Sequence, residues 1–192
     1  MPQINSHAVA FLRTRRSRPA KTLTGPAPND AALRELLTIA ARTPDHGKLE
    51  PWRFIVLRQP ALIRLGALAR ARGAERGNDT EQCDKIGVMF ETAPLSVAVI
   101  ASPKPSEKIP EIEQTLSAGA VCLALLNASL ASGWGANWLS GWTAMDRPFL
   151  TDGLNLEPHE FVAGFIHLGT ETSTPPDRPR PDIDAITSWV SE

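Results

Sequence analysis

Two adjacent arginines and a serine, Arg15, Arg16 and Ser17, stand near the start of the chain in the stretch FLRTRRSRPAK. A planar guanidinium presents a fork of N–H donors that matches two oxygens of a phosphate, so an arginine pair beside a hydroxyl could bind an anion. The alternative is that these cations lie at the end of a helix and only complement its dipole. The residue types alone leave both interpretations open.

Two further groups of residues could contact a ligand. The first is ARTPDHGKLEPW, residues 41–52, a Pro-restricted connection between an expected helix and an expected strand that carries Arg42, His46 and Lys48. The second is GWGANWLSG, residues 133–141, where three glycines would let the backbone approach a ligand and tryptophans offer flat surfaces to an aromatic ring. The plainer interpretation of the first group is a polar surface loop. The plainer interpretation of the second is that its tryptophans belong to the core.

Several signatures of other chemistries are absent from the sequence. There is no GxGxxG, GxxxxGK[ST], GxSxG, HExxH or CxxC motif. The four histidines are scattered without the spacing of metal ligands, so no metal site is expected. No nucleophile and base can be paired from the sequence, and we expect no catalytic side chain.

The elements that must position these groups form one mixed α/β domain over residues 1–192, with a small central sheet. Capping residues and apolar spacing predict helices from Ser6, from Asn29–Asp30 to before Pro44, from Pro60 to about Arg72, and from Pro110 to Gly133. The expected order of elements is helix, helix, strand, helix, helix, strand, helix, strand, strand, which includes one further helix before the strand at 94. Apolar and β-branched runs predict strands over 53–58, 94–102, 135–141 and 160–169. The polar segment 71–82 is expected to be a loop, and the Pro-rich tail from Glu171 is expected to be extended.

Composition excludes several classes of protein. A net charge of -1 argues against a dedicated nucleic-acid-binding protein. The uncharged stretch 114–145 contains a helix of membrane-spanning length, but its polar residues favour a fully packed core helix and no membrane partner. The Arg-bearing, acid-free N-terminus leaves a mitochondrial transit peptide as an alternative. Two cysteines without metal spacing suit a reducing compartment, and we expect a cytoplasmic protein.

The long helix is rich in small residues, which would let another helix approach its backbone closely. These residues are Ser117, Ala118, Gly119, Ala120, Ala124 and Ala128. In a monomer they indicate tight internal packing. Together with a tail that has little to pack on, they also favour a homodimer.

The three groups, in this order, resemble the nitroreductase superfamily, and in particular its small NAD(P)H-dependent, FMN-binding members. The matching stretches are RRS, ARTPDHGKLEPWRFIVL in place of A-P-D-H…Q-P-W-x-F, and SAGAVCLALLNASLASGWGANWLSG in place of S-A-G…G-x-G-x-x-W-R-S-G. The resemblance covers nearly the whole chain and lowers the case for a transit peptide. It implies an α+β nitroreductase-like fold, with a mixed or antiparallel sheet flanked by helices and the long helix buried at a dimer interface.

Residue by residue, the resemblance implies two sets of cofactor contacts. The FMN contacts would be Arg15, Arg16, Ser17, Arg42, His46, Trp138, Leu139 and Ser140. The contacts to the nicotinamide nucleotide would be Ala128, Ser129, Leu130, Ala131, Ser132 and Gly133. The sequence departs from the family at Leu139, where an arginine is expected, and at Glu50, where glutamine is common. One charged contact to FMN is therefore missing.

The resemblance also implies the activity. NADH or NADPH would deliver hydride to FMN, and a nitroaromatic, quinone or similar small acceptor would then take the electrons. Each homodimer would hold two FMN sites built from both chains, with the tail, residues 171–192, packing on the partner. Leu139 keeps open an alternative, a flavin-binding or flavin-modifying protein with little NAD(P)H reductase activity. A nucleic-acid-binding protein that uses the basic N-terminus is a third hypothesis.

Overall fold

A computed structural model of the protein describes residues 3–192. The main helices are α1 (Ser6–Thr14), α2 (Asp30–Ala40), α3 (Gln59–Glu75), α4 (Thr80–Glu91), α5 (Glu111–Ala131) and α6 (Arg147–Leu154). The strands are β1 (Leu23–Thr24), β2 (Trp52–Leu57), β3 (Leu95–Ala101), β4 (Gly135–Leu139) and β5 (Phe161–Glu171). Four 3-10 turns complete the order: η1 (Ala20–Thr22), η2 (His46–Lys48), η3 (Trp142–Ala144) and η4 (Asp184–Ile186).

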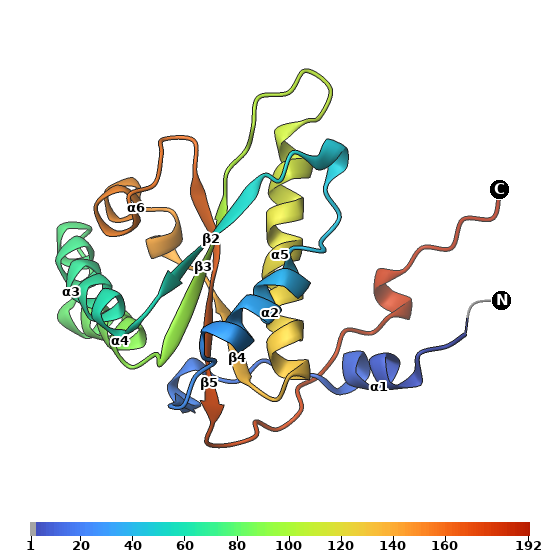
Figure 1. Cartoon of the computed structure of the whole chain (residues 1–192), viewed down its shortest axis with the longest axis horizontal. Helices are drawn as coiled ribbons and strands as arrows, with labels where there is room; N and C mark the ends of the chain where they lie inside the picture. The colour runs from blue at the N-terminus through green and yellow to red at the C-terminus, as the bar shows by residue number, and fades with distance from the viewer. Residues whose placement is uncertain (1–2) are drawn as a thin grey trace.

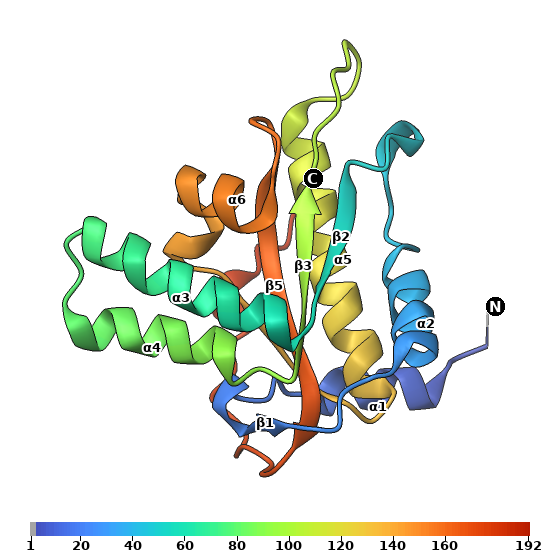
Figure 2. The ribbon, with the colours of Figure 1, turned by 60° about the vertical axis from the view of Figure 1, so that its left-hand side comes forward.

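The five strands form a single antiparallel sheet in the order β1-β5-β3-β2, with β4 also paired to β5. Helices cover both faces, as Figure 2 shows: α3, α4 and α6 lie on one face, and α5 with α2 on the other. Because β3 is buried on both sides, all seven of its residues are buried. The predicted α+β fold with a small sheet flanked by helices is therefore confirmed.

Two hydrophobic clusters fill the space between the layers. Alternate residues of β3 and β5 point to opposite faces, so Ala98 and Phe165 join the cluster under α3, α4 and α6, whereas Val97 and Ile166 join the one under α5. Phe90 of α4 anchors the first cluster, with its ring edge-on to Phe165 at 5.2 Å between centroids. The sheet is thus held from both sides.

The ends of the elements differ from the predictions in several places. Segment 71–82 is a loop only over residues 76–79, because α3 continues to Glu75 and Asp79 caps α4, accepting a hydrogen bond from the Gln82 N–H at 2.8 Å. Asn5, and not Ser6, caps α1 by accepting from the Ala8 N–H at 3.0 Å. The short elements β1 and α6 were not predicted, and β5 continues to Glu171.

The long helix α5 is only partly packed, which corrects the prediction of a fully packed helix. Its inner face contacts the sheet and α2, while Ile112, Leu116 and Leu123 are 62%, 65% and 44% exposed on its outer face. Among the described residues it is the one helix long and apolar enough to match a membrane span, a test that a core helix also passes.

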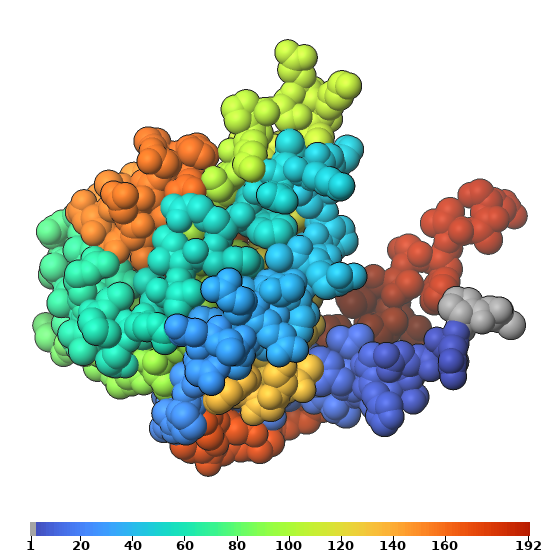
Figure 3. All heavy atoms as spheres, viewed as in Figure 1, coloured from blue at the N-terminus to red at the C-terminus, as the bar shows by residue number. Residues whose placement is uncertain are grey.

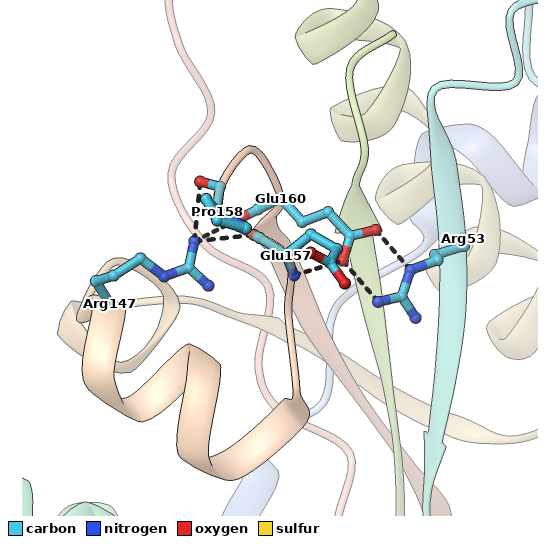
Figure 4. A network of polar contacts seen from close by, with 5 residues as sticks. All are labelled: Arg53, Arg147, Glu157, Pro158 and Glu160. Carbon is cyan, nitrogen blue, oxygen red and sulfur yellow. Dashed lines mark hydrogen bonds and ion pairs between the residues drawn. The ribbon is translucent and has the colours of Figure 1, made fainter.

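A polar network fixes the turn between α6 and β5 (Figure 4). Arg53 of β2 makes a bidentate ion pair with Glu160, with both N–O distances at 2.7 Å. Arg147 donates from Nη1 to the backbone oxygens of Glu157, Pro158 and Glu160, at 3.3, 3.3 and 2.8 Å. The hydrogen bonds from Arg53 hold the pKa of the Glu160 carboxyl down at about 2, against the effect of its burial.

Candidate functional site

The segment after α1 carries the predicted arginine pair and runs beside β4. The backbone N–H of Arg18 donates to the Ala136 carbonyl at 2.8 Å, and the Asn137 side-chain amide donates to the Arg18 carbonyl. These contacts place Arg15 and Arg16 against the junction of α5 and β4, with Ser17 half-buried after them. Both arginines line a cavity of about 220 Å³, together with Leu130, Gly133, Trp134 and Glu171, among others.

The arginine pair has unused hydrogen-bonding capacity. The Nε atoms of Arg15 and Arg16 are buried and have no hydrogen-bond partner among residues 3–192. Burial lowers the pKa of the Arg15 guanidinium, and the positive charges of Arg180 and Arg16 lower it further. A buried donor without a partner is costly, and neighbouring cations repel one another. The cavity therefore fits an anion with several acceptor oxygens, such as a phosphate.

Arg18 has a different role from its two neighbours. It forms an ion pair with Glu171 at the end of β5. Its Nη1 also donates to the Arg16 carbonyl at 3.1 Å. Arg18 thus holds the backbone that carries Arg15 and Arg16. Its own charge is neutralised by Glu171.

Arg180 is a residue that the sequence did not connect with this site. It lies in the extended tail, and its positive charge is one cause, after burial, of the lowered pKa of Arg15. It is not among the residues that line the cavity. The only signal in the sequence was the basic pair of DRPRPD, and nothing there indicated where an extended segment passes.

The turn η2, which carries His46, lies at the other end of α5 (Figure 1). The Ser117 hydroxyl of α5 donates to the Pro44 carbonyl at 2.8 Å and accepts from the Trp52 indole at 3.2 Å. His46 contacts Glu113 of α5, with 2.7 Å between Nδ1 and Oε2. Arg42 is exposed just after α2. The long helix therefore positions this half of the predicted site.

The backbone of this turn is tightly constrained. Gly47, Lys48 and Glu50 all have left-handed φ values, 72°, 54° and 47°. The φ of Gly47 favours glycine, and a Cβ there would lie 2.5 Å from Ile109 Cδ1, so the end of that side chain would have to move. Asp45 secures the turn by accepting from the Glu50 N–H at 2.6 Å. Strain of this kind is typical of ligand-binding segments.

One chain does not bring the two halves together. His46 contacts α5 at Glu113, whereas the arginine cavity includes Leu130 near the other end of that helix. At a rise of 1.5 Å per residue, these two positions on the helix are about 25 Å apart. The predicted FMN contacts therefore fall into two groups in the monomer.

The three predicted contacts on β4 point in different directions. Trp138 packs over Gly164 on the α5 side of the sheet and donates from Nε1 to the Ala163 carbonyl at 3.3 Å. Leu139, next along the strand, pairs with Phe165 and faces the opposite side. Ser140 is exposed after the strand ends. Trp138 itself is 37% exposed, so part of its indole can meet a ligand.

Gly164 is what allows Trp138 to lie against β5, and this leads to a prediction. In Gly164→Ala the new methyl group would lie 2.1 Å from Trp138 Nε1 and 2.6 Å from Cδ1, so the indole must move. We expect a changed near-ultraviolet circular dichroism signal and FMN affinity lowered about two- to tenfold, the value of one aromatic contact. Gly25→Ala, where nothing lies within 4 Å, is the control. An unchanged spectrum would contradict this packing.

The segment predicted to contact the nicotinamide nucleotide, residues 128–133, is the last turn of α5. Ala128 and Ser129 are buried, and the Ser129 hydroxyl donates to the Leu125 carbonyl at 2.7 Å. Leu130 and Gly133 line the arginine cavity, whereas Ala131 and Ser132 are exposed. The segment therefore borders the site, and its contact with the nucleotide stays a prediction.

Comparison with known proteins assigns this architecture to a family. The family model described as "Nitroreductase family" matches residues 12–170. An Escherichia coli K12 protein named "Putative NAD(P)H nitroreductase YdjA" is 32% identical over 163 residues, covering 85% of this chain and 87% of that protein. A Haemophilus influenzae protein named "Putative NAD(P)H nitroreductase" is 34% identical over 165 residues, covering 85% and 88%. The chain belongs to the nitroreductase family, which confirms the resemblance.

A solved structure supports the fold. The crystal structure of a "putative nitroreductase in complex with FMN" from Desulfovibrio desulfuricans matches with a TM-score of 0.75 and 22% identity, covering 98% of this chain and 99% of that one. At this identity the likeness concerns the fold. Together, the family model and the relatives place the protein in the nitroreductase family, whose relatives named above are putative NAD(P)H nitroreductases.

Proposed function

We propose that the protein is an FMN-dependent oxidoreductase that uses NADH or NADPH to reduce a nitroaromatic, a quinone or a similar small acceptor. The observation that carries the proposal is the arginine cavity, where the buried Nε atoms of Arg15 and Arg16 have no partner among residues 3–192. FMN, when bound, would accept hydride from NAD(P)H and pass the electrons to the acceptor.

The chain's own residues would bind and orient the cofactor. Arg15 and Arg16 would hold the phosphate, because both line the cavity and their buried Nε donors have no partner among residues 3–192. Trp138 would offer its exposed indole to a planar ring. Protons can come from water, so we assign no side chain as catalytic.

We further propose that each site is completed by a second copy of the chain. The exposed residues Ile112, Leu116 and Leu123 follow one another at helical spacing on the outer face of α5, and the last two lie between the two halves of the site. Two α5 helices packed antiparallel about a two-fold axis would bring His46 of one copy toward the arginine cavity of the other. This arrangement would bring the two halves of the site, about 25 Å apart along one α5, to a common position.

The tail and α1 support the same assembly. Both project from the packed body of the molecule, as Figures 1 and 3 show. The tail residues Ile183, Ile186, Trp189 and Val190 are 62–85% exposed. Apolar side chains in this number are unfavourable in water. In the proposed dimer the tail would pack on the partner subunit.

A charge on the outer face of α5 tests this assembly. Leu123→Asp is expected to weaken dimerisation by more than about 100-fold, because each copy would bury an unpaired carboxylate. FMN affinity should fall with it, since half of each site would be lost. Size-exclusion chromatography with light scattering measures the first effect and a flavin titration the second. Ile63→Asp is the control, as Ile63 is 52% exposed on α3, across the sheet. A Leu123→Asp dimer with normal FMN affinity would overturn the two-chain site.

The visible spectrum of the purified protein tests the central proposal. We expect a yellow protein, or one that becomes yellow with added FMN, whose flavin absorbance bleaches with NADH or NADPH under anaerobic conditions. A colourless protein that neither binds FMN nor oxidises NAD(P)H in its presence would overturn it.

A second function is favoured by one observation. Leu139 replaces the arginine expected in W-R-S, and its side chain faces Phe165 in the other layer. A flavin-binding or flavin-modifying protein with little NAD(P)H turnover would tolerate this loss. Stopped-flow bleaching of the bound flavin separates the two functions: fast bleaching supports the reductase, and bleaching over many minutes supports the alternative.

A further inference from the structure

Two residues of α5, one helical turn apart, hold the segment around His46. The Ser117 hydroxyl donates to the backbone carbonyl of Pro44, two residues before His46, at 2.8 Å. Glu113 contacts the His46 side chain itself, with 2.7 Å between Oε2 and Nδ1. All four residues line a cavity of about 570 Å³ beside α5. The first turns of α5 therefore hold both the backbone and the ring at this position.

The contact with Glu113 determines which nitrogen of the His46 ring carries a proton. An ionised carboxylate can only accept hydrogen bonds, so Nδ1, the ring atom that faces it, must be protonated. Nε2 is then left for other partners: it accepts in the neutral ring and donates in the imidazolium. Asp45 lines the same cavity, but its Oδ2 accepts from the Glu50 backbone N–H at 2.6 Å. The carboxylate of Asp45 thus holds the turn, and that of Glu113 holds the ring.

We propose that Glu113 is a positioning residue of the flavin site: it holds Nδ1–H of His46, so that Nε2 is presented to the flavin ring. This inference rests on the proposed function and on the two-chain site, because it requires His46 to reach FMN at the arginine cavity of a second copy. There Arg15 and Arg16 would hold the phosphate, which leaves His46 to contact the ring.

The contact is suited to orienting the ring and adds little to the stability of the fold. The His46 and Glu113 side chains are 62% and 46% exposed, and a pair so open to water contributes little to the free energy of unfolding. The turn is constrained separately by its left-handed backbone at Gly47, Lys48 and Glu50. Loss of the Glu113 charge should therefore leave the turn in place and release only the ring.

Nitrogen NMR of the free full-length protein tests the position of the proton. At a pH high enough for a neutral ring, the chemical shifts of the two ring nitrogens show which one is protonated. We expect Nδ1–H in the wild type and a shift of the proton toward Nε2 in Glu113→Gln, because an amide can donate as well as accept and no longer requires Nδ1–H. Glu111→Gln removes the other acid of the first turn of α5, outside this cavity, and serves as the matched control. Equal spectra for the wild type and Glu113→Gln would overturn the inference.

Titration with FMN and with riboflavin tests the contact with the ring. Glu113→Gln should weaken the binding of both ligands by a similar factor, about two- to fivefold, the range of an exposed ion pair. Riboflavin has the same ring and lacks only the phosphate, so a loss for FMN alone would contradict an effect through the ring. The melting temperature without ligand should equal that of Glu111→Gln, which loses the same charge from the same helical turn.

A double-mutant cycle shows whether Glu113 acts through His46. In a His46→Ala background, Glu113→Gln should cause no further loss of FMN affinity, because the ring that it positions is gone. A loss that persists without His46 would overturn the inference. If the wild-type protein binds no flavin, the proposed function and this inference both fail; if it binds FMN and Glu113→Gln binds equally well, only this inference fails.

Discussion

Arg15→Ala or Arg16→Ala is expected to weaken FMN binding by about 10- to 150-fold, the value of one or two hydrogen bonds between charged groups. Each variant removes a guanidinium whose buried Nε has no partner among the described residues. Without FMN, neither should lower the melting temperature, because a half-buried cation that is repelled by a neighbouring cation and has an unpaired buried Nε does not stabilise the fold. Flavin titration and thermal unfolding without FMN measure the two effects separately.

Two other arginines of the same stretch serve as controls for this prediction. Arg13→Ala should leave FMN affinity unchanged, because Arg13 is exposed in the last turn of α1. Arg18→Ala should lower the melting temperature, since it breaks the pair with Glu171 and the contact to the Arg16 carbonyl. Equal losses of affinity for Arg13, Arg15 and Arg16 would make the stretch a general basic patch. A large drop in melting temperature for Arg15→Ala alone would show that Arg15 has a structural role.

Stability is expected to fall as pH drops from about 6.5 to about 4, because His167 cannot take up a proton in the folded protein. Its ring is fully buried in β5, 6.2 Å from the ring of Phe90, and neither ring nitrogen has a partner within residues 3–192. Burial lowers its pKa from 6.5 to about 4. Between these two values the unfolded chain binds the extra proton, so the free energy of unfolding should drop by up to about 3 kcal/mol.

Urea unfolding at a series of pH values measures this loss. His167→Leu should flatten the dependence between pH 6.5 and 4, whereas His159→Leu, at an exposed position, should leave it unchanged. Glu160 acts in a lower range: its folded pKa of about 2 lies below the usual 4.5, so the stability it contributes is lost as pH falls from about 4.5 toward 2. An unchanged slope in His167→Leu would contradict the role of the buried ring.

Much of the fold follows from local signals. Apolar runs predicted β2 to β5, and Asn29 caps α2 as expected, accepting from the Ala32 N–H at 2.9 Å. The errors have local causes too. Residues 71–82 are rich in glycine and polar side chains, so the end of α3 and the start of α4 were not predicted there. Helix α6 was not predicted because it has only eight residues and contains Pro148 and Gly153. Its cap, Asp146, is also held by Arg72 of α3 and by Arg76 directly after that helix, which are distant in sequence.

Less of the candidate site could be predicted from the sequence. RRS and the two loops were identified by residue type and family pattern, but their positions depend on tertiary structure. The separation of Arg15 from His46 follows from the packing of α1 and η2 against opposite ends of α5. The approach of Arg180 depends on the path of a Pro-rich segment without regular structure. The pairing of Arg18 with Glu171 links positions 153 residues apart.

The length of α5 has a consequence for how this chain can change. If two copies share each site, the number of turns in α5 sets the distance between the His46 turn and the arginine cavity. Two antiparallel copies can superpose these two groups only at that distance. Removing four residues from the middle of α5 would shorten it by about 6 Å and leave every proposed ligand contact in the sequence intact. We therefore expect insertions and deletions to be tolerated in loops such as 102–110, and strongly selected against within α5, even at positions that touch no ligand.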